Sequence, residues 1–121
     1  MMELAGEFES LIEDVKNSLG DSLISMKIFT SDGIILYSDS KQSPGEDFLV
    51  ASFSAIAEIS RSISTHLNLK EPSILLLEEE SFVLIKRVTN DVILMVNVRG
   101  SHAEHSEVID HILRRLSEFF H

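Results

Sequence analysis

The stretch from Asp47 to Leu69, DFLVASFSAIAEISRSISTHLNL, has more apolar surface than a single helix interface needs. On a helical wheel, at about 100° per residue, its apolar residues form two adjoining sides. The first side consists of Leu49, Phe53, Ile56, Ile63 and Leu67, and the second of Phe48, Ala51, Ala55 and Ile59. A surface helix of a small domain normally buries one stripe, so the second side predicts contact with another chain.

The same helix has one clearly polar strip, made of Ser54, Glu58, Arg61 and Thr65. Glu58 and Arg61 lie three residues apart, and we expect them to form only a weak surface ion pair. If the apolar side pairs with a second copy of the chain, this polar strip stays exposed beside its symmetry mate. We therefore expect the strip to contact a further protein partner.

The chain before this helix alternates between helical and extended patterns. Apolar residues recur at helical spacing from Leu4 to Leu19, and Gly20 stands where a C-terminal cap is expected. Strands are predicted over residues 23–29 and 34–38. The Asp-Gly pair of the intervening TSDG turn supplies the positive φ that a tight hairpin needs. A polar loop is predicted over 39–47.

The chain after the helix contains three strand candidates, at 73–78, 82–88 and 92–98. The turns between them are short, which implies antiparallel neighbours. A last amphipathic helix follows, with Ser101 as the predicted N-cap, because Glu104 stands at capping-box spacing; Ser106 is a later alternative start. The order predicts a single α+β domain over 1–121, with a five-stranded antiparallel sheet packed between helices.

Charge and composition exclude several classes of protein. The 121 residues include 20 acidic and 10 basic side chains, giving a net charge of −10, which argues against nucleic-acid binding. No cysteine is present, so thiolate chemistry is excluded. No apolar run reaches the roughly 18 residues that span a bilayer, and the acidic N-terminus does not read as a signal peptide. We therefore expect a cytoplasmic protein without membrane insertion.

No nucleotide or catalytic motif stands out. The glycine pattern matches neither a phosphate loop nor a dinucleotide-binding fingerprint. Ser38, Ser40 and Ser43 lie in one predicted loop, and a nucleophile there would need His66, an orienting acid and an oxyanion hole. We predict that the protein is not an enzyme, with no catalytic residues and no cofactor.

A metal site is also not predicted. His102 and His105 share a helical face, a spacing that metal sites use, but a polar helix start explains them as well. The side chains of Glu78, Glu79 and Glu80 are adjacent and point apart, which is typical of a solvated turn.

The chain resembles the roadblock family, which includes dynein light chains and the MglB-type regulators of small GTPases. The resemblance covers about residues 7–120. It rests on the element order, the hairpin at Asp32-Gly33, the small-residue-rich helix 47–69 and the three-strand meander 73–98. Longin and other profilin-like domains have related element orders, but the helix before the first strand favours roadblock.

The resemblance implies a homodimer, or a dimer with a related roadblock subunit, formed by the middle helix and the edge strand. The implied interface residues are Phe48, Ala51, Ser52, Ala55, Ile59, Ile74, Leu75, Leu76 and Leu77. It also implies that the dimer binds and regulates a small Ras-like GTPase, and we expect the polar strip to be the surface that contacts it. Two alternatives remain open: a structural adaptor in a larger roadblock or longin complex, and a profilin-like sensor of a small ligand.

Overall fold

The computed structural model describes residues 2–39, 45–70 and 72–120, with side chains described from Gly6 onwards. Most of the predicted loop, residues 40–44, lies outside the described residues. The elements are α1 (Met2–Leu19), a short 3₁₀ turn η1 (Gly20–Ser22), β1 (Leu23–Thr30), β2 (Ile35–Ser38), α2 (Glu46–Leu67), β3 (Ser73–Leu77), β4 (Ser81–Arg87), β5 (Val92–Arg99) and α3 (His102–Phe119). Each predicted helix and strand is present, with ends shifted by one or two residues.

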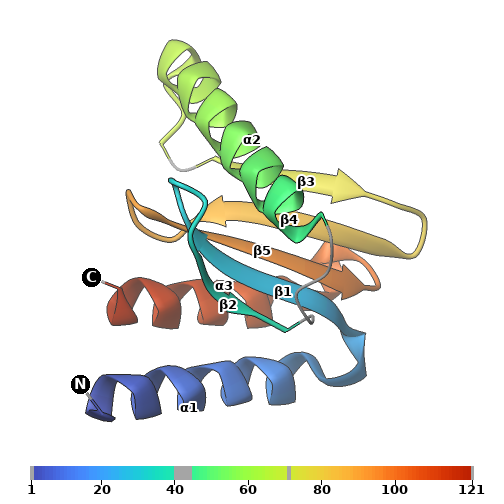
Figure 1. The fold of residues 1–121 in the computed structure, drawn as a ribbon. Coiled ribbons are helices and arrows are strands. Elements are labelled where there is room, and N and C mark those ends of the chain that lie inside the picture. The colour runs from blue at the N-terminus through green and yellow to red at the C-terminus, as the bar shows by residue number, and fades with distance from the viewer. Residues whose placement is uncertain (1, 40–44, 71, 121) are drawn as a thin grey trace.

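The five strands form one antiparallel sheet in the order β2-β1-β5-β4-β3. Helices α1 and α3 lie side by side on one face, and α2 crosses the opposite face (Figure 1). The predicted five-stranded sheet between helices is therefore confirmed. This order makes β3 an edge strand, which pairs with β4 along its whole length, from Ser73↔Lys86 to Leu77↔Phe82.

The two faces of the sheet carry unequal cores. The face under α1 and α3 has the larger core, whose buried members are Leu11, Ile12, Val15, Leu19, Met26, Ile28, Phe82, Leu84, Val92, Leu94, Val96, Val98, Ile109, Ile112 and Leu116. The face under α2 has a smaller core of Phe29, Val50, Ala57, Ile85, Ile93 and Met95. Alternate residues of each central strand serve opposite faces, as strand geometry requires. The smaller core leaves more of α2 uncovered.

Local signals set several of the element ends. Gly33 has a φ of 89° in the β1–β2 turn, a value that side-chain-bearing residues rarely adopt. Asn68 ends α2 in the left-handed region, with φ 59°. The Ser101 hydroxyl accepts a hydrogen bond from the Glu104 amide at 3.2 Å, so the predicted N-cap starts α3. Among the described residues, no helix combines the length and apolar character needed to cross a membrane.

Candidate self-association and partner surface

The outward side of α2 is an exposed apolar ridge, which we define as Phe48, Ala51, Ala55, Ile59 and Ile63. Phe48 is 74% exposed, Ile59 60% and Ile63 52%. Ala51 and Ala55 are also exposed, and their small side chains would allow another backbone to approach closely. Large apolar side chains aligned along one helix in this way are typical of an interaction site.

The sheet-facing side of α2 differs from the first apolar side of the sequence prediction. Phe53 and Ile56 do pack against the smaller core, but Leu49, Ile63 and Leu67 are exposed. The buried positions of α2 instead include Val50, Ser54, Ala57 and Ser64. Small residues on this side let the helix lie close to the sheet, which turns the larger aliphatic side chains outward. The exposed apolar surface is therefore larger than the sequence indicated.

The edge strand β3 adds apolar surface beside α2. Leu75, Leu76 and Leu77 are 38%, 48% and 74% exposed. Ile74 is only half-buried and packs against the smaller core, so it contributes less to the outer surface than predicted. An open strand edge with apolar side chains is a template for pairing with another chain unless something covers it.

The predicted polar strip is only partly exposed. Ser54 is 8% exposed, so its assignment as a partner contact is wrong: it faces the sheet, where its Oγ finds no hydrogen-bond partner among the described residues. Glu58 remains exposed but pairs with Arg87 of β4 and not with Arg61 as predicted. Arg61 donates a long hydrogen bond, 3.4 Å, to the Asn90 side chain. Thr65 is exposed, and its hydroxyl donates to the Arg61 carbonyl at 3.0 Å.

A buried polar cluster at the start of α2 was not predicted. The Lys27 ammonium donates to Glu46 Oε1 and to the Ser38 hydroxyl, both at 2.8 Å, and Ser38 donates to Glu46 at 2.6 Å. Lys27 and Glu46 are 5% and 3% exposed. The hydrogen bond from Lys27, followed by that from Ser38, lowers the pKa of Glu46. The one available signal was a lysine inside the apolar strand LISMKIF.

The residues considered for catalysis or metal binding have other contacts. His105 Nε2 lies 3.0 Å from the Arg99 carbonyl oxygen, and the His102 ring meets the Phe82 ring edge-on, 5.4 Å between centroids. His66 Nδ1 lies 2.9 Å from the carbonyl oxygen of Ser62, within its own helix. Among residues 2–39, 45–70 and 72–120, no three His, Cys, Asp or Glu side chains are grouped as a metal site would require. Ser40 and Ser43 lie outside the described residues.

Solved structures share this fold at low sequence identity. MglB from Myxococcus xanthus matches with a TM-score of 0.77 and 12% identity, over 92% of each chain. A Roadblock/LC7 domain from Streptomyces avermitilis matches with a TM-score of 0.71 and 10% identity, over 87% of this chain and 92% of that one. An MglB structure with a tetrameric arrangement matches with a TM-score of 0.74 and 11% identity, over 93% of this chain and 89% of that one. The chain therefore has a roadblock-type fold, as the sequence predicted.

No protein-family model matches the sequence, and no curated protein matches it either. The TM-scores of 0.71–0.77 show a shared fold, and at identities of 10–12% the partners have to be argued from the surface of this chain itself.

Proposed function

We propose that this roadblock-fold protein is a non-enzymatic, cytoplasmic homodimer that binds and regulates a small Ras-like GTPase. The observation that carries the proposal is the exposed apolar ridge on α2, which lies beside the open edge of β3. A second copy would cover both, with α2 packed on α2 and β3 near β3 around a two-fold axis. The structural likeness to MglB and to a Roadblock/LC7 domain supports this arrangement at the level of the fold.

The partner surface would flank the paired helices. Glu58, Arg61 and Thr65 are exposed on α2, outside the apolar ridge. In a two-fold dimer they occur twice, so one GTPase would contact the strips of both protomers. Exposed charges of this kind mainly set the association rate and its salt dependence.

A capture experiment tests the GTPase proposal. The full chain is immobilised and offered candidate Ras-like GTPases loaded with GDP or with a slowly hydrolysed GTP analogue. We expect retention that depends on the nucleotide state, because the regions of a GTPase that rearrange with its nucleotide are the surface a regulator reads. Retention of both forms alike would favour the adaptor reading, in which the chain tethers other subunits through the β3 edge.

A further inference from the structure

A hollow of about 540 Å³ lies between the C-terminal half of α2, the start of β3 and the β4–β5 turn, and it reaches α3. Five of the ten lysines and arginines of the chain line it, namely Arg61, Lys70, Lys86, Arg87 and Arg114. No acidic side chain is among its described lining residues. In a protein with a net charge of −10, this concentration of basic side chains makes the hollow a local positive region.

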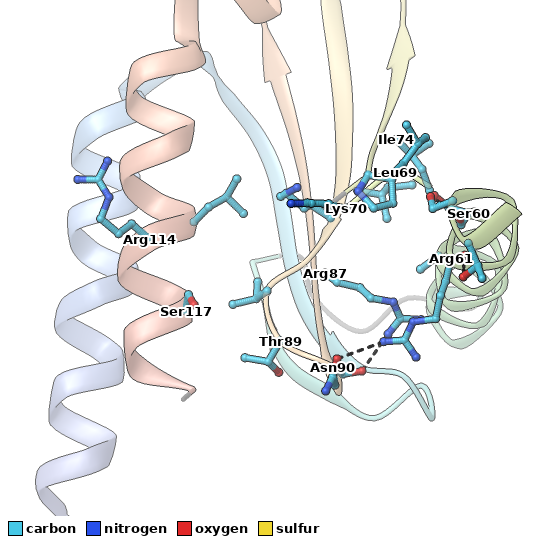
Figure 2. Close-up of a pocket in the computed structure, with 18 residues that line it drawn as sticks. Ser60, Arg61, Leu69, Lys70, Ile74, Arg87, Thr89, Asn90, Arg114 and Ser117 are labelled. Atoms are coloured by element: carbon cyan, nitrogen blue, oxygen red, sulfur yellow. Dashed lines mark hydrogen bonds between the residues drawn. The ribbon is translucent and has the colours of Figure 1, made fainter. Parts of the chain in front are cut away.

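Two of these arginines converge on one turn. Arg61 comes from α2 and Arg87 from β4, and both point toward Asn90 (Figure 2). Arg87 donates to the Asn90 carbonyl oxygen at 3.0 Å, and Arg61 donates to the Asn90 side-chain oxygen at 3.4 Å. Glu58 forms an ion pair with Arg87, whereas the printed contact of the Arg61 guanidinium is with Asn90.

Arg87 retains unused hydrogen-bonding capacity. Its Nε is buried and has no hydrogen-bond partner among the described residues. Guanidinium groups match phosphate and carboxylate oxygens in a two-pronged geometry. An anion beside Arg61 and Arg87 would offset the like charges of the two arginines and accept hydrogen bonds from their guanidinium groups.

The rest of the lining is suited to an organic ligand. Ala57, Ile74 and Ile85 give it an apolar part, and the volume falls in the range of about 300–1,000 Å³ that is usual for small-molecule sites. We propose that this hollow binds a small organic anion, with a phosphate or carboxylate group held by Arg61 and Arg87. The site goes beyond the proposed dimer, because Ala57 is on the buried side of α2, away from the apolar ridge.

Arg114 offers a matched control for the test. It lies at the α3 side of the hollow, but its side chain points away from α2 and from the two converging arginines (Figure 2). Arg61→Gln and Arg114→Gln remove the same charge from the same chain. The first removes a proposed ligand contact and the second does not.

Phenyl phosphate and benzoate are suitable probes, because each joins an anionic group to an apolar ring. Each is titrated into the ¹⁵N-labelled full chain at constant ionic strength, and the amide shifts of Ser60, Thr89 and Asn90 are followed by NMR. We expect saturation by at least one probe, a Kd raised about tenfold or more by Arg61→Gln, and a change under about twofold with Arg114→Gln. Tighter binding of one probe assigns the anion as phosphoryl or carboxylate.

Two results would overturn the proposal: no saturation by either probe up to about 10 mM, or equal weakening by both variants, which would indicate general charge attraction. Sedimentation of the same samples reports the dimer separately, so failure of the anion site and failure of the proposed assembly are distinguishable.

Discussion

Lys27 and Glu46 form a buried ion pair, with 2.8 Å between Nζ and Oε1, that ties the start of α2 to β1. The pair joins residues that are 19 positions apart, and the Ser38 hydroxyl of β2 donates to the same carboxylate oxygen. Removing one member of a buried pair leaves the other charge without compensation, whereas replacing both by apolar residues is often tolerated. Glu46→Gln should therefore lower the melting temperature more than the double change Lys27→Met with Glu46→Leu, as calorimetry would show.

The same pair predicts a pH dependence of stability. Because the folded pKa of Glu46 is lowered from its ordinary value of 4.5, the folded state favours the ionised carboxylate. The contribution of the ionised carboxylate to the stability of the fold is complete above the ordinary pKa, and it is lost as the pH falls through the folded pKa. In urea unfolding, the free energy of unfolding of the wild type should exceed that of Glu46→Gln, and this difference should shrink as the pH falls below 4.5. A margin that is constant with pH would contradict this assignment.

Ile59→Asp should shift the dimer toward monomer. Ile59 is 60% exposed in one protomer, so the change places a charge in the proposed interface without disturbing the core. Each buried aliphatic side chain contributes about 1.5–3 kcal/mol, so we expect the dimer Kd to rise at least tenfold. Sedimentation velocity provides the measurement. Ile34→Asp is the matched control, because Ile34 is 61% exposed and lies in the β1–β2 turn; a monomeric parent at micromolar concentration would refute the dimer.

Glu58→Gln should weaken GTPase capture and flatten its salt dependence, because the removed charge lies on the exposed polar strip. A full reversal with Glu58→Arg is unsuitable, since it would place a second positive charge beside Arg87. Glu107→Gln, on the exposed side of α3, removes the same charge on the opposite face of the sheet and should leave capture unchanged. GTPase binding by both variants is measured at two salt concentrations. Identical binding curves for Glu58→Gln and Glu107→Gln would show that the polar strip is not part of the partner surface.

Ser54→Ala should stabilise the fold and leave partner capture unaltered. Its hydroxyl is buried without a hydrogen-bond partner among the described residues, a situation that costs about 1–3 kcal/mol. Alanine also has the higher helix propensity. We expect the free energy of unfolding to rise by about 1 kcal/mol in urea denaturation. A loss of stability would instead show that the hydroxyl has a partner in solution.

Asn68 should tolerate glycine better than alanine. Its backbone is left-handed, with φ 59° and ψ 34°, at the C-terminal end of α2. A Cβ in this conformation costs roughly 1–2 kcal/mol, which asparagine partly offsets and alanine does not. In chemical denaturation, the free energy of unfolding of Asn68→Gly should therefore equal or exceed that of the wild type, and that of Asn68→Ala should be about 1 kcal/mol lower than the wild type. The reverse ranking would contradict the helix end described here.

The element order could be predicted because its signals are local. The Asp-Gly turn at Gly33, the N-cap at Ser101 and the apolar periodicity of each segment act within a few residues. The orientation of α2 could not be predicted, because two adjoining apolar sides of the helix compete for contact with the sheet. The choice depends on how closely the helix approaches, and the small residues Ser54 and Ala57 decide it.

The sequence alone determined the order of helices and strands, the α+β class and the excess of apolar surface on the middle helix. It could do so because periodicity and turn chemistry are properties of neighbouring residues. Only the tertiary structure decided that Glu58 meets Arg87, 29 positions away, and that Lys27 meets Glu46. It also brought Arg61 and Arg87 to one turn. These contacts depend on how α2 lies across the sheet, and that packing joins residues whose separation along the chain has no periodic signature.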